Sequence, residues 1–196
     1  MHPEIARLLD STTAHAKHGE WGATFRICDD AYQLSLRAGD ADGLLEILTR
    51  LCDYYRQAGE NELAVEHAEL TLHVAAQYDS KSHVGRALNV LGIIEQNKGN
   101  IVVAEEIYLR ARDYSLAADD KRMLGCVEQN LGILANIRGD LRSAAARYQA
   151  GLGCLQEAGD ERGCSQVLNN LGMLHVDLHR LDEADQYFER ALDICG

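Results

Sequence analysis

The sequence predicts an all-α protein, a right-handed α-solenoid of about five helix-turn-helix repeats with about ten antiparallel helices. Three observations favour this fold class. Residue types recur at a step of 40 residues along the 196-residue chain. Within each recurrence, apolar residues follow the 3.6-residue period of a helix. Finally, Val, Ile, Thr and aromatic residues do not dominate the composition, which disfavours a large β-sandwich.

Several independent columns of residues share the 40-residue step. Gly92, Gly132 and Gly172 each follow a leucine, and Cys52 takes the corresponding place one repeat earlier. Further columns hold turn glycines, alanines and bulky aromatic residues, namely Gly19, Gly59, Gly99 and Gly139; Ala64, Ala104, Ala144 and Ala184; and Tyr108, Tyr148 and Phe188. We therefore predict one domain over residues 1–196, with repeats at about 1–40, 41–80, 81–120, 121–160 and 161–196.

Each repeat is expected to contain two helices. In the first helix of the fourth repeat, Val127, Leu131 and Leu134 fall on one face. Short polar side chains suited to capping stand where the first helices begin, at Asp40, Ser80, Asp120 and Asp160. The turn glycines then end those helices, because glycine tolerates the left-handed geometry after a helix. Asn100 and Asp140 are expected to cap the second helices that follow.

The charge balance excludes several classes of partner. The chain has 19 lysines and arginines against 31 aspartates and glutamates, a net charge of −12. Such a field repels nucleic-acid phosphates and anionic membrane surfaces, so neither partner is expected. No apolar run is long enough to span a bilayer. The six cysteines form no CxxC pair, which indicates reduced thiols in a cytoplasmic protein.

No motif indicates catalysis, so the chain is predicted not to be an enzyme and to need no cofactor. The glycines of Gly151-Leu152-Gly153 lie within a predicted helix and lack the spacing of a phosphate-binding loop. His175 and His179 stand four residues apart in a predicted helix, a spacing that suits zinc, but no third ligand is evident. A pair of exposed or hydrogen-bonded histidines is the alternative interpretation.

The repeats resemble the tetratricopeptide repeat. The matching residues are Asn130-Leu131-Gly132, Gly139-Asp140, Ala144, Tyr148 and Gly151. With a step of 40 residues, the chain is similar to the longer-helix variant found in kinesin light chains and bacterial signalling regulators. In that family the first helices line a concave groove that holds a partner peptide, and asparagines just before the Leu-Gly pair grip its backbone. Asn130 and Asn170 match that position.

The resemblance thus implies a peptide-binding groove, rich in amides. Its candidate residues are Arg50, Arg86, Asn89, Ile93, Gln96, Asn97, Gln129, Asn130, Ile133, Asn136, Gln166, Asn169, Asn170 and Met173. Amide side chains can donate to and accept from a peptide backbone, so they hold a chain with little regard to its sequence. Arg50 and Arg86 are expected to meet a carboxylate.

These features together predict a non-enzymatic scaffold that binds a peptide or protein segment, as part of a larger bacterial signalling or regulatory protein. The alternative is a sensor domain that binds a small effector and controls an attached output domain. The last repeat lacks a polar capping helix, so Phe188, Leu192 and Ile194 are expected to be partly uncovered. A homodimer through this repeat is a further expectation, alongside a missing neighbouring domain.

Overall fold

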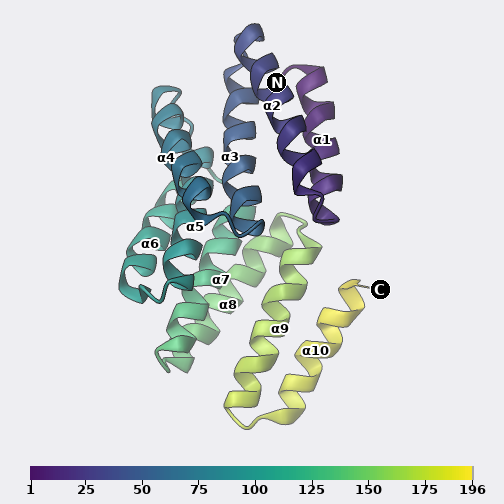
Figure 1. Cartoon of the computed structure of the whole chain (residues 1–196). Helices are drawn as coiled ribbons and strands as arrows, with labels where there is room; N and C mark the ends of the chain where they lie inside the picture. Colours follow the sequence, from purple (N-terminus) through teal and green to yellow (C-terminus); the bar gives the residue numbers. More distant parts are fainter. Residues whose placement is uncertain (196) are drawn as a thin grey trace. The chain divides into compact units, whose positions relative to one another are not determined.

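A computed structural model describes residues 1–195. In that range the chain forms helices and no strand, which confirms the predicted all-α fold class (Figure 1). The helices are α1 (Pro3–Lys17), α2 (Trp21–Ala38), α3 (Ala41–Gln57), α4 (Asn61–Gln77), α5 (Lys81–Asn97), α6 (Ile101–Ala117), α7 (Lys121–Ile137), α8 (Leu141–Glu157), α9 (Glu161–Asp177) and α10 (Leu181–Cys195). Two helices thus fall within each predicted 40-residue repeat.

Four of the predicted caps form as expected, and one prediction is wrong. Asp40, Asp120 and Asp160 each accept a hydrogen bond from the backbone N–H three residues later, at 2.9–3.0 Å. Asp140 does the same for α8 at 3.0 Å. The prediction for Asn100 is wrong: its side chain makes no cap bond to α6 and instead donates through Nδ2 to the Glu95 carboxylate at 2.7 Å. The charge-assisted bond from Nδ2 orients the amide toward Glu95, and its Oδ1 accepts no cap bond from α6.

The turns between paired helices require a left-handed backbone. Gly59, Gly99 and Gly139 have φ angles of 86°, 82° and 77°, which confirms that glycines end the first helices. In the last repeat His179 stands at this place, with a φ angle of 56°. A residue with a Cβ atom adopts this geometry at a cost in free energy.

The chain divides into two compact units, and the division falls within α5. Unit 1 spans Met1–Ile94. In it, α1 packs on α2 and α3, and α3 packs on α4 (Figure 1). Its core has two clusters, one of Ile5, Leu9, Cys28, Ala31, Ile47, Leu51 and Tyr54, the other of Cys52, Ala64, Ala68, Ala87, Val90 and Ile94. Cys28 and Cys52 are fully buried and act as small core residues.

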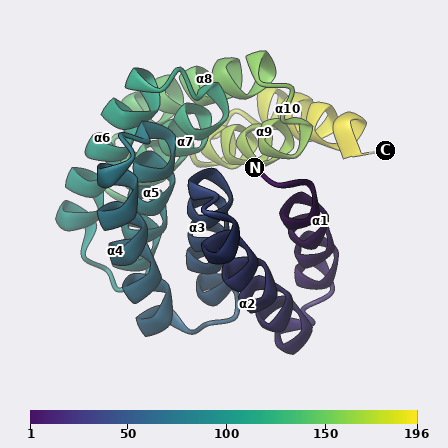
Figure 2. The same cartoon turned by 90° about the horizontal axis from the view of Figure 1, so that it is seen from above.

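Unit 2 begins at Glu95. Here α7 packs on α6 and α8, and α9 packs on α8 and α10 (Figure 2). Two glycines allow the close approach of paired helices: a Cβ atom on Gly132 would meet the Tyr148 ring at 2.6 Å, and one on Gly172 would collide with the Phe188 ring. On α10, Leu192 is 71% exposed, while Phe188 and Ile194 are half-buried, so all three are partly uncovered within residues 1–195, as predicted. In the part of the chain that the structure describes, no helix combines the length and hydropathy needed to cross a membrane.

Candidate functional site

The larger part of the predicted site lies in unit 2, on the first helices of its last two hairpins. On α7 the residues Gln129, Ile133 and Asn136 recur at helical spacing, away from the buried Val127 and Leu131. On α9 the corresponding positions carry amides and a methionine, and α7 contacts α9. We call this surface the amide face: Gln129, Asn130, Ile133, Asn136, Gln166, Asn169, Asn170 and Met173.

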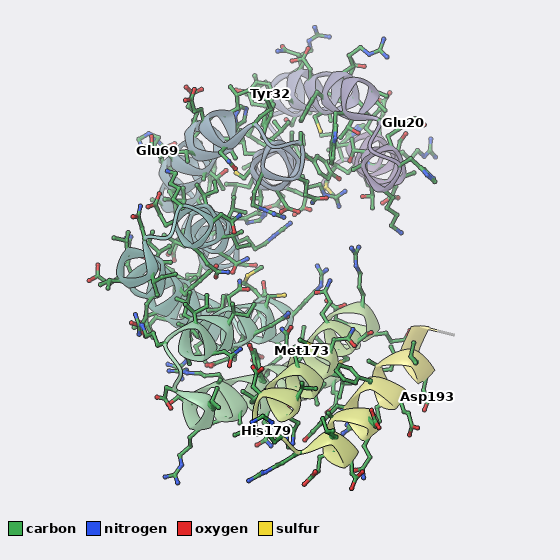
Figure 3. The ribbon with its side chains drawn as sticks, turned by 60° about the horizontal axis from the view of Figure 1, so that its bottom comes forward. Glu20, Tyr32, Glu69, Met173, His179 and Asp193 are labelled. Atoms are coloured by element: carbon green, nitrogen blue, oxygen red, sulfur yellow. The ribbon has the colours of Figure 1, made fainter. Side chains whose placement is uncertain are left out.

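The amide face combines accessible side chains with buried polar atoms. Gln166 and Asn169 are exposed, and Met173 is 56% exposed along α9 (Figure 3). Asn136 Oδ1 and Asn170 Nδ2 are buried and have no hydrogen-bond partner within residues 1–195. A buried polar atom without a partner costs about 1–3 kcal/mol. The amide face therefore contains one acceptor and one donor whose bonding capacity is unused.

Two more predicted residues of unit 2 lie at the end of α5. Gln96 is already engaged, because its Oε1 accepts a hydrogen bond from the Tyr108 hydroxyl at 3.0 Å. Asn97 is exposed. The Gln96 side chain thus stabilises the contact between α5 and α6 within this unit.

The predicted residues of unit 1 are largely committed to contacts inside the chain. Arg86 donates to both oxygens of Glu46, at 2.6 and 3.4 Å. Arg50 donates to the same carboxylate at 2.7 Å and to the Leu9 carbonyl at 2.6 Å. Asn89 is 9% exposed and Ile93 half-buried. The carboxylate that the two arginines were expected to meet is therefore supplied by α3 itself.

The environment of Glu46 explains why it remains charged. Burial by itself would raise the pKa of this carboxyl, but the neighbouring His83 imidazole and the Arg86 and Arg50 guanidiniums outweigh burial and hold its pKa well below the usual range. Its side chain is only 20% exposed. Glu46 thus links α3 to α5 electrostatically, and it fixes the two arginines in place.

The candidate histidine pair is not on one helix. α9 ends at Asp177, so His179 lies in the turn beyond it (Figure 3). His175 lies on α9, with its ring centroid 5.0 Å from that of Tyr187. The prediction that both histidines lie in one helix is therefore wrong. Within the described residues, no group of three or more His, Cys, Asp or Glu side chains is arranged to hold a metal ion.

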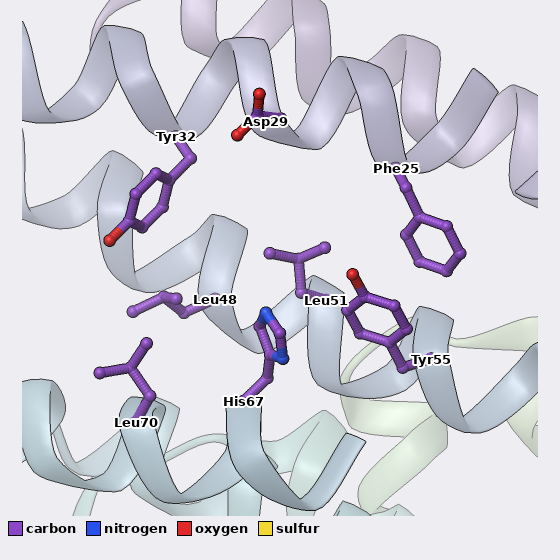
Figure 4. Close-up of a pocket in the computed structure, with 8 residues that line it drawn as sticks. All are labelled: Phe25, Asp29, Tyr32, Leu48, Leu51, Tyr55, His67 and Leu70. Carbon is purple, nitrogen blue, oxygen red and sulfur yellow. The ribbon is translucent and has the colours of Figure 1, made fainter. Parts of the chain in front are cut away.

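Sequence reasoning missed a pocket in unit 1, between α2, α3 and α4. It has a volume of about 220 Å³ and carries aromatic, acidic and imidazole side chains on its walls (Figure 4). Its aromatic residues belong to the first two repeats, which match the repeat columns least. The helical spacing of Trp21, Phe25 and Tyr32 on α2 was the one signal in the sequence that could have pointed to it.

Comparison with known proteins agrees with this architecture. Residues 165–196 match the family model of the tetratricopeptide repeat. The predicted resemblance to tetratricopeptide repeats is confirmed. The chain is 22% identical over 182 residues to Protein KINESIN LIGHT CHAIN-RELATED 3 of Arabidopsis thaliana; the match covers 85% of this chain and 28% of that relative. The chain therefore spans little more than a quarter of the length of this relative.

Two solved structures share the fold of this chain. BtubC (BKLC) from P. vanneervenii superposes with a TM-score of 0.65 at 22% identity, over 97% of this chain and 88% of that one. Aspartyl phosphate phosphatase F from Bacillus subtilis superposes with a TM-score of 0.76 at 11% identity, over 94% of this chain and 48% of the phosphatase chain. The likeness to these chains is one of fold.

Proposed function

We propose that the protein is a non-enzymatic interaction scaffold whose amide face binds an extended segment of a partner protein. The observation that carries this proposal is the pair of buried, unpartnered atoms, Asn136 Oδ1 and Asn170 Nδ2. A peptide backbone offers a donor and an acceptor at every residue, so it can satisfy both kinds of atom.

The apolar members of the amide face would give the partner segment its side-chain preference. Ile133 is half-buried on α7 and Met173 is exposed on α9, and they stand one repeat apart. A methionine adapts its shape to different apolar side chains. All eight residues are uncharged, so we expect binding to depend on shape and backbone hydrogen bonds and to change little with salt.

We further propose that this interaction operates within a cytoplasmic bacterial signalling or regulatory protein. The likeness to the Bacillus subtilis aspartyl phosphate phosphatase F supports this context. The match covers 48% of the phosphatase chain, so in that bacterial protein the shared fold is part of a longer chain. The negative net charge of −12 supports a protein partner over a nucleic acid.

The test begins by selecting, from a random display library, a peptide that binds the wild-type chain. The affinity of this peptide is then measured by calorimetry. The double substitution Asn130→Ala and Asn170→Ala should weaken binding about tenfold or more, since each lost backbone hydrogen bond is worth about 1 kcal/mol. Asn170→Ala by itself should leave the melting temperature nearly unchanged, because the Asn170 amide nitrogen has no partner to lose.

Asn61→Ala is the matched control, because Asn61 is an exposed asparagine on α4, outside the amide face. It should leave the affinity unaltered. Equal affinity of the double variant and the wild type would reject the amide face as the binding surface. A small molecule that copurifies with the protein and is detected by native mass spectrometry would favour the effector-sensing alternative.

A further inference from the structure

We propose that unit 1 carries a second binding site, the pocket between α2, α3 and α4, which accepts the guanidinium side chain of an arginine from a partner polypeptide. This site lies on different helices from the amide face and belongs to the other unit, so it does not depend on the function proposed above. Its lining residues are Phe25, Asp29, Tyr32, Leu48, Leu51, Tyr55, His67 and Leu70.

The pocket has an apolar floor and polar groups at its walls. Leu48 and Leu51 of α3 form the floor and are 2% and 8% exposed. Figure 4 shows Asp29 of α2 and His67 of α4 on opposite sides of this floor, with Tyr32 toward one end. A volume of about 220 Å³ is below the several hundred Å³ that cofactor or drug sites occupy. The space suits one long side chain.

The other end of the pocket is aromatic. The rings of Phe25 and Tyr55 stack with centroids 4.3 Å apart and an angle of 15° between their planes. The Tyr55 ring also lies 4.8 Å from the imidazole of His67, and the Phe25 ring lies 6.3 Å from that of Trp21. Ring faces attract cations, and a planar guanidinium can also stack on them. An aromatic wall of this kind favours arginine over lysine.

Asp29 supplies the opposite charge. Its carboxylate is exposed, and within residues 1–195 it forms neither a hydrogen bond nor an ion pair. It lies close enough to the aromatic wall to affect Tyr55, whose pKa is raised first by burial and further by the negative charges of Asp29 and Glu60. A carboxylate beside an aromatic ring can bind a guanidinium in two ways. The carboxylate pairs with its positive charge, and the ring stacks on its planar surface.

The surroundings add to the attraction for a cation. α4 contributes three glutamates, Glu62, Glu66 and Glu69, all exposed, and carries neither lysine nor arginine. The Nδ1–H of His67 donates to the Leu63 carbonyl at 2.9 Å, which leaves Nε2 as an acceptor for a guanidinium N–H. A negatively charged neighbourhood also speeds the approach of a basic segment.

The test is an NMR titration of the full chain with a capped Gly-Ser-Arg-Ser-Gly peptide at constant ionic strength. We expect saturating shifts of the aromatic signals of Phe25, Tyr32 and Tyr55. The same peptide with citrulline in place of arginine keeps the shape but removes the charge, and it should bind at least about threefold more weakly.

Two variants separate the pocket from the general field of the protein. Asp29→Asn should weaken the binding of the arginine peptide at least about threefold. Asp30→Asn removes the same charge from the neighbouring exposed residue, which does not line the pocket, and should leave the affinity nearly unchanged. Equal losses in the two variants, equal binding of the citrulline peptide, or the absence of saturating shifts would each overturn the proposal.

Discussion

The Glu46 carboxylate accepts a hydrogen bond from the Arg86 guanidinium at 2.6 Å, although the two residues are 40 positions apart in the sequence. This separation equals one repeat, so the pair occupies equivalent places on α3 and α5. The same carboxylate binds Arg50 and lies 3.6 Å from His83 Nε2. One acidic side chain therefore holds two successive first helices of unit 1 together.

Glu46→Gln should lower the free energy of unfolding of unit 1 by about 1–3 kcal/mol, because a partly buried network of ion pairs loses its only charged acceptor. Urea denaturation, followed by circular dichroism, measures this change. Asp53→Asn is the control, because Asp53 is 43% exposed and pairs only within α3; it should cost less than about 1 kcal/mol. Equal costs for the two variants would contradict the importance assigned to Glu46.

The stabilisation by Glu46 should depend on pH. Its pKa is lower in the folded protein than in the unfolded chain, so its contribution is fully present above the unfolded pKa of about 4.3 and is lost as the pH falls further. The difference in unfolding free energy between the wild type and Glu46→Gln should therefore be fully present at pH 5 and shrink below about pH 4. A difference that stays constant down to pH 3 would show that the charge of Glu46 does not stabilise the fold.

Two glycines in the α7–α8 hairpin should respond to alanine with opposite signs. Gly132→Ala places a Cβ atom 2.6 Å from the buried Tyr148 ring and should destabilise the protein by about 1–3 kcal/mol. Gly153→Ala meets open space inside α8 and should stabilise it by up to about 1 kcal/mol, since alanine restricts the unfolded chain and favours helix. Thermal unfolding of both variants checks the pair. A change of the same sign in both would contradict the close helix contact at Gly132.

His179→Gly should stabilise the α9–α10 hairpin. His179 has a φ angle of 56°, a geometry that glycine adopts without strain. The expected gain is about 0.5–1 kcal/mol, reduced by the greater freedom of glycine in the unfolded chain. Gly139→Ala makes the reverse change in the α7–α8 turn, where φ is 77°, and should destabilise. A loss of stability in His179→Gly would mean that its imidazole makes a stabilising contact.

Cys28 and Cys52 should be inert in the folded protein. Burial raises the pKa of the Cys28 thiol to about 12 and that of Cys52 to about 11, and both side chains are fully buried. At pH 8, alkylation by iodoacetamide should be at least about a hundredfold slower than in denaturant. Peptide mapping by mass spectrometry assigns the modified positions. Rapid labelling of either thiol in the native protein would show that the core of unit 1 opens readily.

The sequence by itself determined the repeats, the helices and most of their ends. Asp120 caps α7 and Gly139 ends it because capping and left-handed turns depend on residues within a few positions of each other. The same local rules failed at Asn100, whose amide is held by Glu95, and at His179, which was expected in a helix but lies in the turn after α9. The amides before Leu-Gly could be placed on one face from the helical period alone.

Only the tertiary structure decided which side chains are already occupied. Arg50 and Arg86 are available in the sequence, but the packing of α1, α3 and α5 brings them to Glu46. The pocket around Phe25 and His67 likewise needs side chains from three helices. Such contacts join residues from different helices, so they depend on how the hairpins pack against one another. Neither the periodicity nor the spacing of residues within one helix determines that packing.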